Sequence, residues 1–159
     1  MAGNYLEQLV AEWYEHEGYF VKRNVWVGKL PSGGDECELD VIAFDPDRNH
    51  LLHIEPTHDA DSWATRTQRF TKKFTAGRKY IPGLLSGITL PDEIEQICRL
   101  GYGSNKNHHT VGCGKIVTVS EFLETVLRKI ARIDTHKGIL SENYPIIRTL
   151  QFLARNKKQ

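Results

Sequence analysis

Cysteine is scarce in this chain of 159 residues, and long apolar runs are missing altogether. The three cysteines, Cys37, Cys98 and Cys113, are odd in number and far apart, which argues against a disulfide framework and favours a reducing cytoplasm. No stretch approaches the roughly 18 consecutive apolar residues that a bilayer-spanning helix requires, so no membrane partner is expected. The first residues lack the basic and then apolar pattern of a secretory signal.

Glycine-rich phosphate loops are missing as well. The sequence contains neither a P-loop nor a G-x-G-x-x-G pattern, so nothing points to a nucleotide cofactor. What is present is the composition of an ordinary globular domain, with 40% hydrophobic and 26% charged residues. The length suits one domain, and we expect residues 1–159 to form a single unit.

The formal net charge of +1 conceals a separation of the two signs along the chain. Residues 1–61 hold 13 acidic and 4 basic residues, whereas residues 62–159 hold 7 acidic and 17 basic ones. A metal-dependent enzyme that acts on a polyanion needs both kinds, because carboxylates hold the cation while Lys and Arg hold the phosphates. Two solvated faces of opposite sign would explain the same pattern.

Hydrophobic periodicity predicts elements in the order α-β-β-β-α-β-β-α-α. Asn4 can cap the first helix, with Glu7 completing a capping-box pattern, and Gly18 and Gly77 are natural stops for the first two helices. This order predicts an α/β or α+β domain with a mixed central sheet of about five strands flanked by helices. The expected helices cover residues 4–17, 62–76, a segment from 120 and 143–153, and the expected strands cover 19–27, 36–44, 51–55, 94–102 and part of 111–119.

Two carboxylates on neighbouring strands are the strongest candidates for chemistry. Asp40 lies inside one expected strand, and Glu55 closes the next. In an antiparallel pair joined by a short turn, the two side chains can lie a few ångströms apart on one face. That separation suits a shared divalent cation, because Mg²⁺ prefers one or two carboxylates together with waters and phosphate oxygens. Glu7 on the first helix could approach the same place and orient a water.

Three segments carry a resemblance to a known family: 19–25, 36–43 with its Glu-Leu-Asp-Val-Ile run, and 53–57 with His-Ile-Glu-Pro-Thr. They resemble the PD-(D/E)xK nuclease superfamily, in particular its restriction-endonuclease-like and Holliday-junction-resolvase-like branches. The resemblance covers about residues 4–82, and Glu38 matches the acid often found two residues before the motif aspartate.

The resemblance implies a restriction-endonuclease-like sheet and hydrolysis of phosphodiester bonds in DNA with Mg²⁺, or with Mn²⁺ in its place. It makes Asp40 and Glu55 the metal ligands and Glu7 an accessory acid. It further implies that two copies of the chain could act as a homodimer, each cutting one strand.

One departure concerns the lysine that this family uses to stabilise developing negative charge. Its position is taken by Thr57, which can hydrogen-bond a water but supplies no charge. The resemblance implies that Lys72 or Lys73, on the second helix, replaces it, with His58 or Lys79 as weaker choices. The alternative is a catalytically inactive module that binds nucleic acid or a protein partner.

The basic second helix is the expected contact for the DNA backbone. Arginine matches phosphate oxygens in a bidentate fashion, and lysine adds point charge. An ordinary solvated helix surface would carry the same residue types. The expected phosphate contacts are Arg66, Arg69, Lys73, Arg78 and Lys79.

Overall fold

The computed structural model describes residues 4–133 and 138–157 as a six-stranded mixed sheet flanked by four helices, which confirms the expected fold class. The strand order is β1-β2-β3-β4-β6-β5. Neighbours β1/β2, β2/β3 and β5/β6 are antiparallel, whereas β3/β4 and β4/β6 are parallel. The elements are α1 Tyr5–His16, β1 Phe20–Lys29, β2 Asp35–Asp45, β3 His50–Thr57, α2 Trp63–Leu84, β4 Glu95–Leu100, β5 Thr110–Val111, β6 Gly114–Thr118, α3 Val119–Ile130 and α4 Pro145–Asn156.

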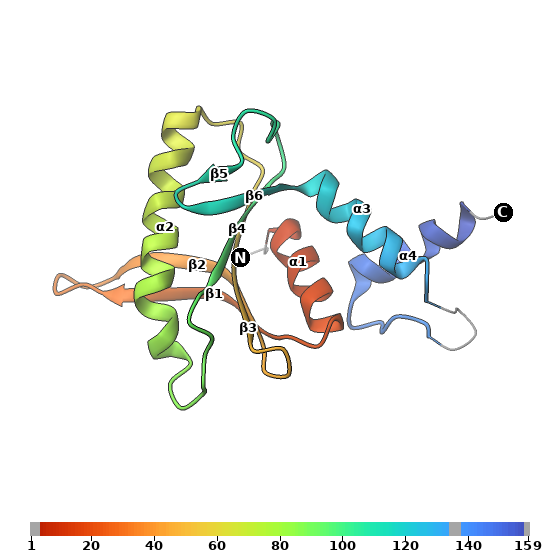
Figure 1. The fold of residues 1–159 in the computed structure, drawn as a ribbon, viewed down its shortest axis with the longest axis horizontal. Helices are drawn as coiled ribbons and strands as arrows, with labels where there is room; N and C mark the ends of the chain where they lie inside the picture. Colours follow the sequence, from red (N-terminus) through yellow and green to blue (C-terminus); the bar gives the residue numbers. More distant parts are fainter. Residues whose placement is uncertain (1–3, 134–137, 158–159) are drawn as a thin grey trace.

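Helices cover both faces of the sheet. Figure 1 shows α2 on one side, with α1, α3 and α4 on the other. One apolar core, which includes Val10, Ile54 and Val126, lies between the sheet and α1, α3 and α4. The opposite face packs on α2 through Phe70 and Phe74, which are almost completely buried. Within 4–133 and 138–157, no helix is long and apolar enough to cross a membrane.

Strands β1 and β2 stay paired with each other beyond the last pair between β2 and β3. The pairing of β2 with β3 ends at Val41 and Ile54, whereas β3 pairs with β4 on its other edge from Leu52 to Thr57. The hairpin end projects past α2 in Figure 1. Asp40, which precedes Val41, and Glu55, which follows Ile54, therefore lie where the two strands separate, and we call this place the fork of the sheet.

Helix α2 is longer than the sequence predicts. Gly77 was an expected stop, but the helix continues through it to Leu84. A Cβ atom at residue 77 would come within 2.2 Å of Nδ1 of His53, so the glycine allows the helix to pass close to β3. Tertiary packing, rather than helix termination, therefore explains this glycine.

The first helix begins as expected, but Glu7 does not play the expected capping role. The side chain of Asn4 accepts a hydrogen bond from the N–H of Leu6 at 3.0 Å. The carboxylate of Glu7 instead accepts from Nδ2 of Asn24 on β1, at 3.0 Å. The contact between α1 and β1 holds Glu7 toward the fork of the sheet.

Candidate functional site

Asp40 and Glu55 meet at the fork between β2 and β3. The backbone N–H of Asp40 donates to Oε1 of Glu55 at 3.1 Å, which fixes one carboxylate against the other strand. Glu55 is almost completely buried, whereas the side chain of Asp40 keeps 12% of its surface exposed. The two acids expected to act together are thus brought together, with Asp40 nearer to solvent.

Lys73 reaches this pair from α2. Its ammonium donates to Oδ1 of Asp40 at 2.6 Å and also to Oε2 of Glu55. Lys72, the other expected replacement for the motif lysine, is exposed on the helix. The structure therefore brings only one of these two lysines into contact with the acidic pair.

The buried imidazole of His53 contacts the carboxylate of Glu55. Nε2 of His53 lies 2.7 Å from Oε1 of Glu55, and Nδ1 lies 3.1 Å from Nε2 of Gln96. The Gln96 amide nitrogen also donates to the backbone carbonyl of Phe74 at 2.7 Å. Because that amide is a donor, Nδ1 of His53 accepts from it, and Nε2–H donates to the carboxylate.

The pKa values at the site reflect burial and crowding of charge. Burial, together with neighbouring Glu55, raises the pKa of Asp40 to about 7, although Lys73 partly opposes this. Burial also raises the pKa of Glu55. Burial opposes the charge on Lys73, but the two acids outweigh it and raise the pKa of the ammonium. Burial and nearby Lys73 lower the pKa of His53 to about 3, so the imidazole is neutral near pH 7.

A cavity of about 230 Å³ opens over these groups. Its walls include Glu7 from α1, Asp40 and Glu55 from the fork, and Arg69 and Lys73 from α2. With Asp59 included, the cavity is lined by four acids and by the two bases Arg69 and Lys73, so it suits a ligand that carries both a cation and phosphate groups.

Thr57, at the variant motif position, holds a guanidinium. Its hydroxyl accepts from Nη2 of Arg69 at 3.0 Å, and Nη1 of Arg69 lies 2.5 Å from Oδ2 of Asp59 and 3.0 Å from Oδ2 of Asp61. A guanidinium from α2, paired with Asp59 and Asp61, therefore stands beside the position that the resemblance assigns to lysine.

The remaining expected phosphate contacts do not line this cavity. Arg66 is buried and donates to the backbone carbonyls of Asp59 and Tyr102 at 2.8 and 3.2 Å. Arg78 donates to Gln96, and Lys79 lies 3.8 Å from Glu36.

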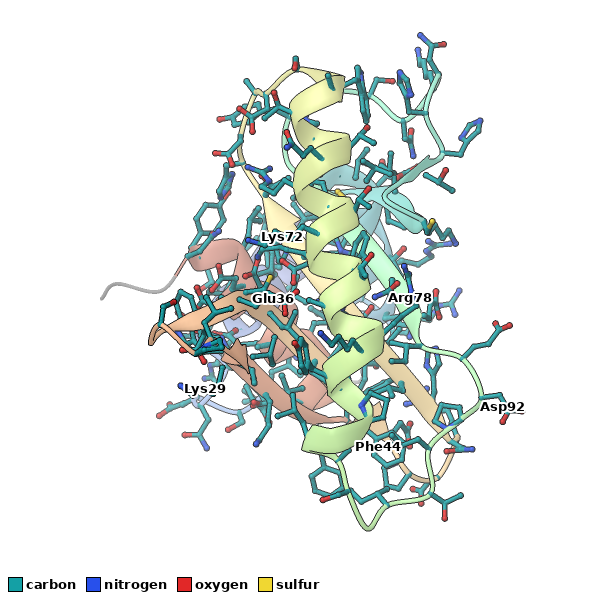
Figure 2. All side chains as sticks on the ribbon, turned by 90° about the vertical axis from the view of Figure 1, so that its left-hand side faces the viewer. Lys29, Glu36, Phe44, Lys72, Arg78 and Asp92 are labelled. Carbon is teal, nitrogen blue, oxygen red and sulfur yellow. The ribbon has the colours of Figure 1, made fainter. Side chains whose placement is uncertain are left out.

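The two edges of α2 present different basic residues. Figure 2 shows Lys72 and Glu36 on one side of α2 and Arg78 on the other.

Arg66, because it is buried, is unavailable to a phosphate. An amphipathic helix pattern could not reveal this, since arginine is ordinarily found at the surface.

His53, Asn24 and Gln96 are the site residues that sequence reasoning missed. His53 could have been found, because it lies two residues before Glu55 and so shares its face of β3. Asn24 and Gln96 come from β1 and β4, and nothing in their own segments indicates a contact with the acids.

Asp40 and Glu55 are the oxygen donors that this site offers to a divalent cation. Among residues 4–133 and 138–157, no three His, Cys, Asp or Glu side chains come together as a metal-binding group. Two carboxylates are nevertheless enough for Mg²⁺, which keeps several waters and takes further oxygens from phosphates. Both acids have raised pKa values, so a nearby cation would stabilise their ionised forms, and Lys73 already supplies one such charge.

Comparison with known proteins yields little. No family model matches this chain, and no curated protein matches it. A similar solved structure is the crystal structure of a protein of unknown function, AF1548, with 18% sequence identity over 96% of each chain and a TM-score of 0.46. That likeness is too weak to bear on fold or activity.

Proposed function

We propose that this chain is a divalent-metal-dependent DNA endonuclease of the PD-(D/E)xK type with a variant active site. The observation that carries the proposal is the contact of one lysine with two carboxylates beside a cavity: Lys73 bridges Asp40 and Glu55 at the fork of the sheet. The family's lysine would then come from α2 rather than from the strand residue at position 57.

Asp40 and Glu55 are the residues that would hold the metal ion. When bound there, Mg²⁺ or Mn²⁺ would lower the pKa of a coordinated water and polarise the phosphoryl group. His53 fixes the orientation of Glu55, and the backbone N–H of Asp40 fixes the same carboxylate from the other side. These two hydrogen bonds hold the carboxylate of Glu55 in place and so reduce the side-chain movement needed when the acids bind a cation.

Lys73 has two uses in this proposal. In the absence of another cation, its ammonium offsets one of the two carboxylate charges. A divalent ion held by both acids would leave the ammonium available to donate to a phosphate oxygen and to stabilise its developing charge. The two acids raise the pKa of this ammonium and keep it protonated in the neutral range. Glu7, held by Asn24, faces the same cavity and can accept a hydrogen bond from a water.

The DNA backbone would approach the edge of α2 that carries Lys72, because Lys73 and Arg69 line the cavity from that helix. DNA is favoured over RNA by the resemblance alone, and a homodimer that cuts both strands belongs to the same proposal.

The test is cleavage of supercoiled plasmid with and without Mg²⁺ or Mn²⁺. We expect metal-dependent nicking that falls by about 100-fold or more in Asp40→Asn and Glu55→Gln, because each loses a charged ligand. Asp47→Asn is the matched control, since it makes the same charge change at an exposed turn. Equal cleavage by Asp40→Asn and wild type would refute the assignment.

The second candidate function is a nucleic-acid-binding module without catalysis. The observation in its favour is that Lys73 forms ion pairs with both acids and so competes with a cation for their oxygens. This candidate predicts salt-dependent DNA binding by the wild type and no cleavage with either metal ion. A gel-shift assay beside the cleavage assay on the same plasmid preparation therefore separates the two functions, because only the second candidate combines DNA binding with no cleavage.

A further inference from the structure

A second cavity, of about 280 Å³, lies on the face of the sheet opposite to the proposed active site. Its floor is formed by β4 and β6, and its walls come from α1 and α3, which lie on the same side of the sheet in Figure 1. Trp13 and Tyr14 face it from α1, and Phe122 faces it from α3. The nuclease proposal makes no use of this cavity.

Arg99 on β4 is the unusual group in this cavity. It is only 3% exposed, and within 4–133 and 138–157 it forms no ion pair with any carboxylate. Its Nε is buried without a hydrogen-bond partner. Its one hydrogen bond in the described part of the chain is a long one, 3.4 Å from Nη2 to the hydroxyl of Tyr14.

Glu121 attracts Arg99 electrostatically but forms no ion pair with it. A buried guanidinium without a direct ionic partner is costly, and a bound anion would reduce that cost. The planar ring of Phe122 lies 4.2 Å from the guanidinium carbon and gives it partial compensation only. Burial lowers the pKa of Arg99, in agreement with an environment that disfavours its charge.

The other bases around the cavity are already paired. Lys129 lies 2.5 Å from Glu17, and His50 lies 2.7 Å from Glu95. Arg48 is bound to Asp45. These lining bases therefore leave little charge for a ligand.

Lys115 on β6 is the exception, because no hydrogen bond or ion pair of its side chain is found among the described residues. The parallel register sets Lys115 beside Ile97, two residues before Arg99, so both bases lie on one face of the sheet. The two acids that line the cavity, Glu17 and Glu95, contact Lys129 and His50. Arg99 and Lys115 therefore remain as two lining bases that form no ion pair with a carboxylate of the described residues.

We propose that this cavity binds a small organic phosphate monoester, with Arg99 at its floor and Lys115 at its rim. Two unpaired bases match a phosphate monoester, which carries nearly two negative charges at pH 7, better than a carboxylate with one. The fork of N–H groups on Arg99 suits bidentate contact with phosphate oxygens, and the aromatic walls suit an apolar or ring-bearing remainder. The volume is near the lower end for small-molecule sites.

The experiment is isothermal titration calorimetry of the full chain with phenyl phosphate in metal-free buffer. We expect binding with one site, reduced at least tenfold in Arg99→Met and about threefold in Lys115→Met, and unchanged in Arg132→Met, an exposed control on the turn after α3. Benzoate should bind more weakly than phenyl phosphate. Absence of phenyl phosphate binding, equal affinity of Arg99→Met and wild type, or stronger binding of benzoate would each overturn the proposal.

Two further readouts keep the result interpretable. If Arg99→Met does not fold, as judged by its thermal transition, the exposed Lys115→Met variant carries the test. Lys73→Met should bind phenyl phosphate like the wild type, because Lys73 lies on the other face of the sheet. Loss of binding in Lys73→Met but not in Arg99→Met would place the anion at the proposed active site and overturn this inference, whatever the outcome of the plasmid assay.

The phosphate monoester could belong to a free small molecule or to the 5′ end of a nucleic acid strand. Hexathymidylate with a 5′-phosphate and hexathymidylate with a 5′-hydroxyl distinguish these sources. A preference for the phosphorylated strand that disappears in Arg99→Met supports the proposal with a strand end as the source. Equal affinity for both strands, beside Arg99-dependent binding of phenyl phosphate, supports it with a small molecule as the source.

Discussion

Asp40 sets the pH range in which the proposed active site can work. Its pKa is raised to about 7, first by burial and then by Glu55, so its carboxylate ionises only near neutral pH. A metal ligand must be deprotonated. We therefore expect Mn²⁺ affinity, measured by calorimetry, to rise between pH 5.5 and 8 with a midpoint near pH 7.

The same shift has a defined effect on stability without metal. Because the folded pKa of Asp40 exceeds the unfolded value of about 4, the folded state binds more protons between these limits. The contribution of Asp40 to the free energy of unfolding therefore falls as pH rises from 4 to 7.

Lys73→Met provides the check on this pH dependence. The ammonium lowers the pKa of Asp40, so its removal should move the midpoint of Mn²⁺ binding above pH 7. Lys72→Met, with the same charge change on the exposed neighbour, should leave the midpoint where it is. A midpoint unaffected by Lys73→Met would show that this ammonium does not act on the metal ligands.

Individual residues differ in how far the sequence could place them. Asp40 and Glu55 were predictable as neighbours, because the short turn between their strands leaves few registers. Lys73 could not be separated from Lys72, since one residue changes the direction of a helical side chain by about 100° and the orientation of α2 on the sheet was unknown. Arg66 was wrongly expected at the surface, because its backbone-carbonyl partners lie in loops.

At the scale of elements, two glycines of α2, Gly77 and Gly83, allow the effect of close packing to be separated from the effect of helix propensity. A Cβ at Gly77 would collide with the ring of His53, whereas a Cβ at Gly83 would meet no atom within 4 Å. We expect Gly77→Ala to lower the free energy of unfolding by about 1–3 kcal/mol and to reduce cleavage, because it displaces the imidazole that orients Glu55. Gly83→Ala should be neutral or stabilising by up to about 1 kcal/mol.

Urea denaturation monitored by circular dichroism measures both glycine variants, and the plasmid assay measures their activity. The comparison is matched, since both substitutions add one methyl group to the same helix. Equal stability of the two variants would contradict the close approach of α2 to β3.

The element order was predictable because most segments have strong periodicity and clear turns. The exceptions have physical reasons. Strand β5 has two residues, too few for a pattern, and α2 continues through a glycine that is required by packing. The pairing of β2 with β3 ends at Val41 and Ile54, although β3 continues beside β4 to Thr57, and no local signal in the sequence marks that end.

At the scale of the whole molecule, the last helix depends on the first. Helix α4 has no side-chain cap from its own N-terminal residue. Instead, Oε2 of Glu12 on α1 accepts from the backbone N–H groups of Ile146 and Ile147, at 2.9 and 3.0 Å. Glu12 is 5% exposed, and Nε2 of Gln8 donates to its other oxygen at 2.9 Å.

Glu12→Ala should therefore release α4. We expect the free energy of unfolding to fall by about 1–3 kcal/mol, because two helix N–H groups lose their acceptor, and tryptic cleavage at Arg148 to accelerate. Glu15→Ala, an exposed change on the same helix, is the control. If Glu12→Ala is cleaved at Arg148 no faster than Glu15→Ala, α4 is held by its apolar contacts and not by this carboxylate.

The link between Glu12 and α4 also has a consequence for biosynthesis. The two partners are separated by 134 positions, so at about 5–20 residues per second the carboxylate waits roughly 7–27 s for the amides that it will bind. During that interval the carboxylate of Glu12 can remain hydrated only if no other segment covers the face of α1 that later contacts α4. Closure around Glu12 therefore follows the emergence of α4, and a nascent chain arrested before α4 leaves the exit tunnel would keep this patch of α1 open to chaperones and proteases.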